Sequence, residues 1–334
     1  MAKKPRSDFF DAVLKRKFGF STCFLCGCRL GKKNRADEHV IPKWIQKKFR
    51  LANQQMHLLN GTTISYRQLT IPCCYTCNNR LLQPIEKKMS AAVEQGAKSV
   101  QAMDPQEVFI WLGKMFYGLL YRELFLPWDR SDKTKGEITS KDLLKQYEMH
   151  HLFLQSVRVP MRFEGFFPAS ILIVSTQEPD DPRLAWDFRD ELRTMCIGCR
   201  VGKVGIVGVL QDGGAQEQMF SLLKLARHKL HPIQFTEVMA QVTYKAMLMN
   251  RVPKYVIIDS DPKTVIQTPL QGFSAKPIFD DWNQEHYAQI LCQITGVPMG
   301  SLFRPPDQVL TWLRNPDGSS KTMPLKKLPI QLGT

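Results

Sequence analysis

The chain has 334 residues, of which 43% are hydrophobic, so it is long and apolar enough to bury a core and to form about two domains. Charged residues make up 23%, an ordinary share that excludes a disordered polyelectrolyte. The formal net charge of +15 is uneven, because residues 1–90 contain 18 Lys and Arg against 5 Asp and Glu, whereas residues 91–334 contain 28 against 26. The basic first quarter predicts contact with a polyanion, either nucleic acid or an anionic membrane, although a solubilising surface would have the same composition.

The first predicted elements lie in a polar, basic segment that contains six of the nine cysteines, and we assign it to a domain at residues 1–90. Helical spacing of Phe9, Phe10, Val13 and Leu14 predicts a short amphipathic helix near the N-terminus. A second helix is expected at residues 43–50, where Trp44 and Phe49 lie among the basic residues.

Two helices are predicted next. Asp104-Pro105-Gln106-Glu107 places Asp at the N-cap, Pro at the first position and Glu at the third, so a helix should begin there and run to about Leu124. Lys114, Arg122 and Glu123 interrupt its apolar stretch, which favours a buried helix over a membrane span. A polar loop then precedes a helix near residues 140–155.

The remainder predicts a mixed domain. Residues 166–175 and 201–210 are rich in β-branched residues and bounded by Gly and Pro, which predicts strands, with 186–196 as another candidate, and 3.6-residue spacing predicts helices. We expect strands at 166–175, 186–196, 201–210 and 255–259, a turn at 212–214, helices at 216–227, 235–250 and 307–314, and a turn at 315–318. Residues 91–334 therefore form a larger α+β domain, whose sequence identifies no chemistry and whose near-neutral charge suits protein partners or regulation.

The N-terminal segment has no apolar run of the length found in signal peptides. We therefore expect a cytoplasmic protein with reduced cysteines, in which a metal is the first explanation for clustered thiols.

Four cysteines have the spacing of a structural zinc site. Cys23 and Cys26 form one Cys-x2-Cys pair, Cys74 and Cys77 form another, and two such knuckles complete a tetrahedral four-sulfur site. Gly27 fits a knuckle because a residue without Cβ is favoured there. Cys73 would leave three residues before Cys77, so we prefer Cys74 as the ligand.

The residues around these pairs resemble a known family. Asp37-Glu38-His39-Val40-Ile41-Pro42 lies between the pairs, and Asn78 directly follows the second pair. The order Cys-x2-Cys, acid-His-Val-Ile-Pro, Cys-x2-Cys-Asn resembles HNH endonucleases, also called His-Me finger or ββα-metal nucleases. The resemblance covers roughly residues 20–90 and implies a zinc-stapled ββα-metal domain at residues 1–90.

The resemblance implies a role for each residue. His39 would be the general base that activates water, and Glu38, on the opposite face of the strand, would bind catalytic Mg²⁺ or Mn²⁺ together with Asn78. The middle Asn of the family pattern is assigned to Asn60, in an Asn-Gly turn, with Asn53 as the alternative. Asp37 is a fallback ligand for the cation.

Basic residues flank the Glu38-His39 pair and are expected to bind phosphates without reading bases. The predicted helix at 43–50 would place Lys43, Lys47 and Arg50 on one face by their i, i+4 and i+7 spacing. A solvated helix face is the alternative. The set of expected nucleic-acid contacts is Lys32, Lys33, Arg35, Lys43, Lys47 and Arg50.

These features predict a metal-dependent endonuclease that hydrolyses DNA, with RNA as another possible substrate, and that nicks one strand at a time. An HNH-like domain followed by a large domain also resembles nuclease components of bacterial anti-phage defence systems of the type II Zorya kind. A zinc-stabilised module that binds nucleic acid without cutting it is the alternative, and so is an interaction protein that works through residues 91–334.

Overall fold

The computed structural model describes residues 9, 19–124, 126–138, 145–222, 228–258, 263–268 and 277–325. The chain is a mixed α+β protein with several small sheets, and it divides into two compact units. The first unit comprises Met1–Glu94, Ala102–Gly165 and Tyr255–Gln267, and the second comprises Gln95–Gln101, Phe166–Lys254 and Thr268–Thr334. The first unit therefore contains the residues of the predicted 1–90 domain and also the long helix and a small sheet that we assigned to the second domain.

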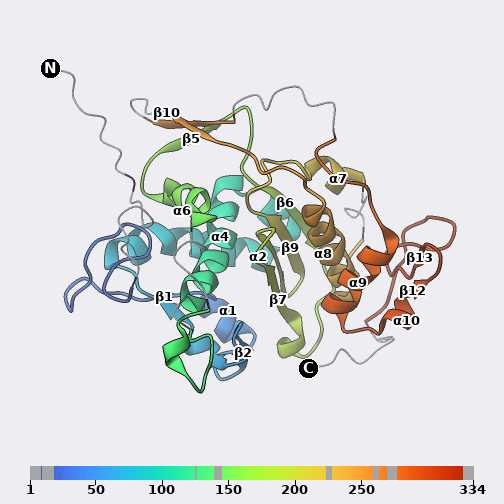
Figure 1. Cartoon of the computed structure of the whole chain (residues 1–334), viewed down its shortest axis with the longest axis horizontal. Helices are drawn as coiled ribbons and strands as arrows, with labels where there is room; N and C mark the ends of the chain where they lie inside the picture. The colour runs from blue at the N-terminus through green and yellow to red at the C-terminus, as the bar shows by residue number, and fades with distance from the viewer. Residues whose placement is uncertain are drawn as a thin grey trace. The chain divides into compact units, whose positions relative to one another are not determined.

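The first unit is built from short strands around helices (Figure 1). Its sheets are the antiparallel pair β1–β4, the hairpin β2–β3 and the three-stranded sheet β10–β11–β5. Its strands are β1 (Glu38–His39), β2 (Gln55–His57), β3 (Thr63–Ser65), β4 (Thr70–Ile71), β5 (Met161–Glu164), β10 (Val256–Ile258) and β11 (Thr264–Gln267). Its helices are α1 (Lys43–Lys48), η1 (Tyr66–Gln68), η2 (Thr76–Leu82), α2 (Gln83–Gln95), α4 (Pro105–Glu123), η3 (Lys133–Lys135), α6 (Glu148–Leu154) and η4 (Gln155–Val157).

Helix α4 is the core element of the first unit, and its predicted start is confirmed. The Asp104 carboxylate accepts a hydrogen bond from the Gln106 amide at 2.9 Å, with Pro105 at the first helical position. Almost the whole helix is buried, and it packs against β4 and α6. At Gly118 a Cβ atom would lie 3.0 Å from Val40, so the absence of a side chain lets α4 approach the strand that carries Glu38 and His39.

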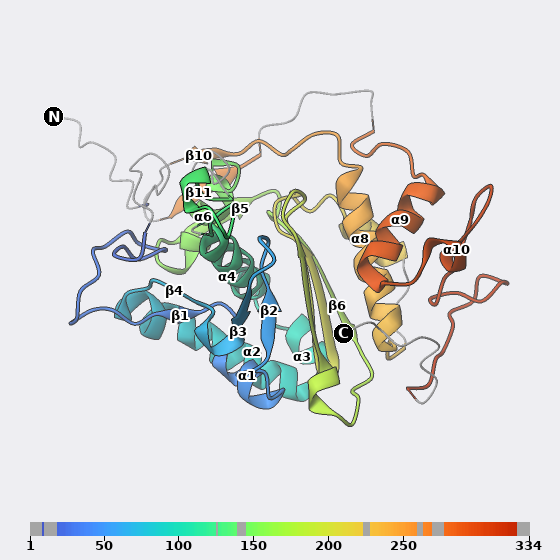
Figure 2. The same ribbon diagram turned by 60° about the horizontal axis from the view of Figure 1, so that its bottom comes forward.

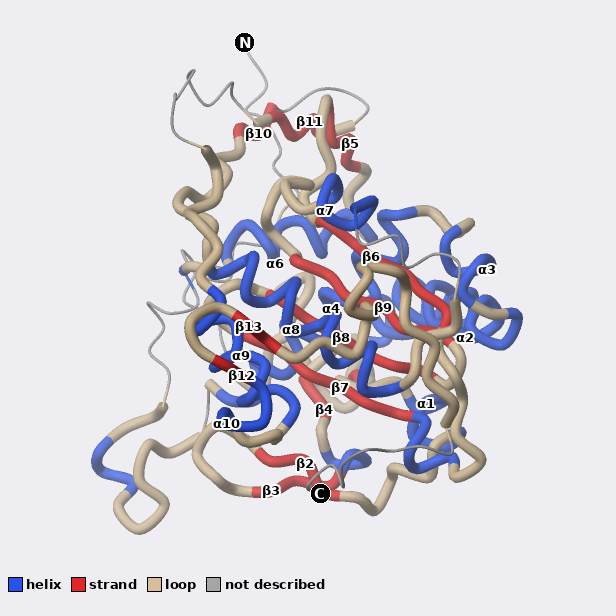
Figure 3. The backbone as a smooth tube through the Cα atoms, turned by 90° about the vertical axis from the view of Figure 1, so that its right-hand side faces the viewer, coloured by secondary structure: helices blue, strands red, loops and turns tan. Residues whose placement is uncertain are grey.

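The second unit is organised on a four-stranded antiparallel sheet of order β6-β9-β8-β7 (Figure 3). Helix α8 packs on β8 and β9, as Figure 2 shows with the sheet seen nearly edge-on. The strands are β6 (Ser170–Ser175), β7 (Trp186–Glu191), β8 (Cys196–Val201), β9 (Val204–Val209), β12 (Phe303–Arg304) and β13 (Gln308–Val309). The helices are α3 (Ala97–Gln101), η5 (Pro182–Ala185), α7 (Glu217–Leu222), α8 (Pro232–Met247), α9 (Gln284–Thr295) and α10 (Met299–Leu302).

The strands predicted at 166–175, 186–196, 201–210 and 255–259 correspond to β6, β7, β9 and, in the first unit, β10. The sequence does not predict β8 as a separate strand, because its ends fall within the two predicted strands on either side. The helix predicted at 307–314 is wrong: Gln308 and Val309 form β13, which pairs with β12. Pro305 and Pro306 lie between these strands, and proline favours a turn over a continuing helix. Most of the predicted N-terminal helix, residues 140–144 of the helix predicted near 140–155, and residues 223–227 of the helix predicted at 216–227 lie outside the described residues. Among the helices described, none combines the length and the apolar character that crossing a membrane requires.

Candidate functional site

The four predicted zinc ligands come together in the first unit. The sulfur atoms of Cys23, Cys26, Cys74 and Cys77 all lie within 4.8 Å of one another. Four thiolates bound tetrahedrally to zinc at about 2.3 Å lie about 3.8 Å apart. The distance between the Cys26 and Cys74 sulfur atoms is 3.8 Å, so the cluster fits a zinc ion.

Each knuckle has its own local geometry. Gly27 adopts φ 71°, in the left-handed region, and its amide donates to the Cys23 carbonyl at 3.0 Å, which closes the first turn. In the second knuckle the Cys77 amide donates to the Cys74 sulfur at 3.4 Å. Hydrogen bonds from the Cys26, Cys73 and Cys77 side chains lower the pKa of the Cys23 thiol, whereas the hydrogen bonds to Cys23 raise the pKa of Cys26 and Cys77. Four thiolates together therefore require a bound metal ion to stabilise them.

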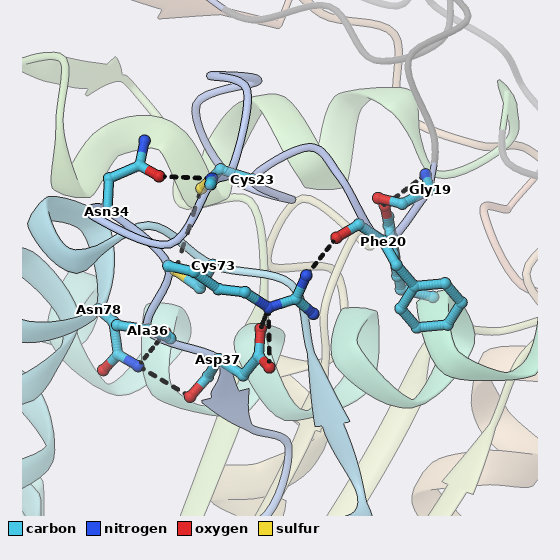
Figure 4. A network of polar contacts seen from close by, with 11 residues as sticks. Gly19, Phe20, Cys23, Asn34, Ala36, Asp37, Cys73 and Asn78 are labelled. Carbon is cyan, nitrogen blue, oxygen red and sulfur yellow. Dashed lines mark hydrogen bonds and ion pairs between the residues drawn. The ribbon is translucent and has the colours of Figure 1, made fainter.

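The choice between the adjacent cysteines is confirmed in favour of Cys74. Cys73 is fully buried, and its sulfur lies 4.0 Å from that of Cys23, but it is not part of the four-sulfur group. Figure 4 shows Cys73 beside Cys23, below the first knuckle. Cys73 therefore packs next to the site without completing it.

Strand β1 presents its two residues in opposite directions. It pairs with β4, with Glu38 opposite Ile71 and His39 opposite Thr70. Glu38 is buried and His39 is half-buried, as expected for neighbouring residues of a strand. Within the described residues, no hydrogen bond to the His39 imidazole is found.

The environment of His39 favours its neutral form. Burial lowers its pKa from the ordinary value of 6.5, and the positive charges of Lys43 and Lys114 lower it further. A neutral imidazole at pH 7 can accept a proton, as a general base must.

Glu38 forms a buried ion pair that the sequence did not predict. Its carboxylate pairs with the Lys114 ammonium at 2.5 Å, and Lys114 also pairs with Glu86. Burial raises the pKa of Glu38. Burial also opposes the charge of Lys114, but the two carboxylates outweigh it and raise the lysine pKa. Lys114 therefore engages Glu38 where the resemblance implies Mg²⁺, and a cation bound by Glu38 would have to displace the ammonium.

Lys114 and Glu86 are the site residues that sequence reasoning missed. Lys114 lies in α4, and its Nζ also lies 3.4 Å from the His39 carbonyl oxygen, so one buried side chain holds both residues of β1. The available signal was the single lysine inside the apolar stretch of α4, because a buried lysine requires a charged partner.

Asn78 holds the segment that leads into β1. Its side-chain amide donates to the carbonyl oxygens of Ala36 at 2.7 Å and Asp37 at 3.1 Å, as Figure 4 shows. No hydrogen bond to its Oδ1 is found within the described part of the chain. The Asn78 nitrogen therefore positions the segment that leads into β1, and its oxygen has no partner among the described residues.

The polar atoms of the Asn60 side chain are engaged by Thr62 and Pro127. Its Oδ1 accepts hydrogen bonds from the amide and the hydroxyl of Thr62 at 3.1 and 2.6 Å, and its Nδ2 donates to the Pro127 carbonyl at 3.3 Å. These bonds shape the β2–β3 turn, and none of them reaches β1. Asn53 is exposed, and no hydrogen bond joins either asparagine to His39 among the described residues.

The predicted phosphate-binding residues are all exposed, but they do not share one helical face. Helix α1 ends at Lys48, and Arg50 has φ 56°, so only Lys43 and Lys47 lie on the helix. The Arg35 guanidinium pairs with Asp37 at 2.9 Å and donates to the Phe20 carbonyl at 2.8 Å. Lys43 is close enough to His39 to influence its pKa. The exposed residues of the set are Lys32, Lys33, Arg35, Lys43, Lys47 and Arg50.

Replacing Lys114 with methionine should destabilise the protein by about 3–5 kcal/mol, because it leaves the Glu38 and Glu86 carboxylates without their buried counter-charge. The Glu38 pKa is already raised, so its ionisation costs stability as the pH rises through the folded-state pKa. Relative to the wild type, the variant should therefore lose stability as the pH increases from about 4.5. Urea unfolding at several pH values measures this.

The matched control is Lys88→Met, which removes an exposed lysine paired with Glu107 and should leave the free energy of unfolding almost unchanged. Adding Glu38→Gln to Lys114→Met should recover part of the loss. Equal stability of Lys114→Met and Lys88→Met would contradict a buried ion pair.

Comparisons with known proteins identify no relative of this arrangement. No protein-family model matches the chain, and neither the curated proteins nor the solved structures give a match. The function of the site is therefore argued from its own residues.

Proposed function

We propose that the first unit hydrolyses phosphodiester bonds in DNA, with His39 as the general base. The observation that carries this proposal is an imidazole without a described hydrogen bond, whose pKa is lowered, on a strand beside a four-cysteine cluster and near the exposed Lys43. Hydrolysis of a phosphodiester requires a base for the attacking water and positive charge near the phosphate.

The surroundings of His39 support both requirements. Lys43 stands at the start of α1, a few residues beyond β1, and supplies positive charge on an exposed surface. Lys32, Lys33 and Lys47 add charges that attract a nucleic-acid backbone. Asn78 and Lys114 fix the backbone on which His39 is mounted, and a fixed base is more effective than a mobile one.

A catalytic Mg²⁺ or Mn²⁺ is part of the proposal through the resemblance to HNH nucleases. The Asn78 Oδ1 has no hydrogen bond among the described residues, and an amide oxygen is a ligand of the kind that Mg²⁺ prefers. The Glu38 carboxylate, in contrast, is paired with Lys114. The two residues do not form an open pair of ligands in this arrangement. The proposed proton transfer therefore rests on His39 alone, and a role in anti-phage defence is proposed on the resemblance only.

The cleavage test uses the purified, zinc-loaded full chain and supercoiled plasmid. With Mg²⁺ or Mn²⁺ present, a site that acts on one strand should first produce nicked circles. Brief treatment with EDTA should abolish cleavage, because the chelator removes the catalytic cation. Plasmid that stays supercoiled with either metal would refute the nuclease proposal, and linear product at first turnover would contradict a single-strand nickase.

Binding of DNA should weaken steeply with salt. Each phosphate neutralised by a lysine or arginine contributes about −0.9 to the slope of log K against log salt, so removing two contacts with Lys43→Ala and Lys47→Ala should make the slope less negative by about 2. Fluorescence anisotropy of a labelled duplex at several salt concentrations measures this slope.

The matched control removes two exposed lysines of the second unit, Lys229 and Lys254, and should leave the slope unchanged. A slope near zero for the wild type, or the same slope change in both double variants, would contradict phosphate binding by the basic surface.

A second candidate is a zinc-stabilised module that binds nucleic acid without cleaving it. The buried Glu38–Lys114 pair favours it, because that pair stabilises the strand and requires no catalytic cation. Such a module would show the salt-dependent binding but no nicking with any metal, so the two assays together separate the candidates.

A further inference from the structure

The second unit contains a cavity that the proposed nuclease chemistry does not use. It lies between α8, α9 and the chain around β13, which Figure 1 shows close together, and its volume is about 700 Å³. The residues that matter for its chemistry are Glu237, Gln241, Trp282, Tyr287, Asp307 and Thr311.

The cavity is built on a fixed buried carboxylate. Glu237 is fully buried in α8, where its Oε1 accepts a hydrogen bond from the Thr311 hydroxyl at 2.5 Å and its Oε2 accepts one from the Trp312 amide at 2.6 Å. These bonds hold the segment after β13 against α8. Burial raises the pKa of Glu237 to about 7, so a nearby positive charge would stabilise its ionised form.

The charge of the lining excludes anionic ligands. Glu237 and Asp307 are its carboxylates, and no Lys, Arg or His is among the described residues that line it, although the charge of Lys321 acts on Glu237. Two carboxylates without a basic partner in the cavity select a cation or a neutral group.

The aromatic residues of the cavity favour an organic cation. The Trp282 ring lies 4.9 Å from the Tyr287 ring and 4.6 Å from the Tyr244 ring, measured between centroids, and Trp282 is 36% exposed. An exposed indole held in place by two other rings offers a face to an ammonium or guanidinium group.

A buried hydroxyl points to the same conclusion. Tyr287 is 5% exposed, and its hydroxyl has no hydrogen bond of standard geometry with the described residues, although the Gln241 side chain is close enough to act as a hydrogen-bond partner that lowers its pKa. A buried polar group is normally satisfied, so this hydroxyl can exchange its weak contact with Gln241 for a hydrogen bond to a ligand once the side chains that cover the oxygen move.

We propose that this cavity of the second unit binds an organic cation, an ammonium or guanidinium group that stacks on Trp282 and hydrogen-bonds to the Tyr287 oxygen beside Asp307. The group belongs either to a free amine or to a Lys or Arg side chain of a protein. This site is independent of the cleavage chemistry of the first unit.

Titration of the purified full chain with agmatine, followed by calorimetry, tests the site. Agmatine should bind saturably, and inorganic phosphate should not compete with it. Tyr287→Phe removes only the hydroxyl, Asp307→Asn removes one charge, and Trp282→Leu removes the aromatic face, so each should weaken binding about tenfold. The blocked tripeptide acetyl-Ala-Arg-Ala-amide should also bind, and whichever probe binds tighter identifies the source of the cation.

The matched control is Asp281→Asn, which removes an exposed charge next to Trp282 that does not line the cavity. It should leave the affinity for agmatine within about twofold. The midpoint of thermal unfolding of each variant should match that of the wild type, so that a change in affinity reflects the cavity and not the fold. Absence of saturable binding, or affinities for Tyr287→Phe and Asp307→Asn equal to those of the wild type and Asp281→Asn, would overturn the proposal.

Discussion

Replacing Cys74 with serine should remove zinc from the protein and unfold much of the first unit. Structural zinc contributes an apparent free energy of about 10–16 kcal/mol in zinc-finger peptides, which is comparable with the whole stability of a domain. Cys74 is one of four sulfur atoms within 4.8 Å of one another, and a serine hydroxyl is a poor replacement for a thiolate ligand. The wild type should retain about one zinc ion per chain after dialysis, and the variant should retain far less.

The adjacent Cys73 gives a matched control. It is fully buried and close to Cys23, but it lies outside the group of four, so Cys73→Ser should retain zinc and lose only the packing of one thiol. Zinc content by mass spectrometry and thermal unfolding are the measurements. If Cys73→Ser lost zinc and Cys74→Ser kept it, the assignment of the second knuckle would be reversed.

Replacing His39 with alanine should lower the rate of plasmid nicking by about 10²–10⁴-fold, because a general base contributes a factor of this size. The side chain is half-buried on β1, where β4 pairs with the backbone, so the substitution should leave the fold and the affinity for DNA unchanged. His57→Ala is the matched control, since His57 is exposed on the β2–β3 hairpin, and it should nick at the wild-type rate.

The pH profile provides a second measurement on His39. A base must be neutral to accept a proton, and the pKa of His39 is lowered from 6.5. The nicking rate should therefore be flat between about pH 7 and 8 and should fall only below about 6.5. A rate that already falls between pH 8 and 7 would identify a base of higher pKa and would contradict the role of His39.

Local features of the structure were predictable from the sequence. The Asp104-Pro105 cap located the start of α4, and Cys-x2-Cys spacing with Gly27 located the two knuckles, because each pattern is decided within one or two turns of chain. The alternating burial of Glu38 and His39 followed from strand geometry alone.

Features that depend on distant segments were not predictable. Lys114 lies 76 residues after Glu38 in the sequence, so no local spacing pattern predicts their ion pair. Asn60 is held by Thr62 and Pro127, and its Asn-Gly turn says only that a hairpin exists. Arg50 leaves the helix because α1 ends early, and helical periodicity does not fix the last residue of a helix.

The Phe24 carbonyl, inside the first knuckle, accepts a hydrogen bond of 2.7 Å from the His151 ring in α6. The neighbouring His150 ring lies 3.2 Å from the Gly113 carbonyl oxygen in α4. Both histidines are buried, so a shift of the knuckle would leave the His151 ring without its partner inside the helical core, next to the ring of His150 that is bonded to α4. Removal of the zinc ion by a chelator should therefore also destabilise α6, because its His151 lies 127 residues after Phe24 in the sequence and bonds to it. The zinc cluster and helices α4 and α6 would melt as one cooperative unit.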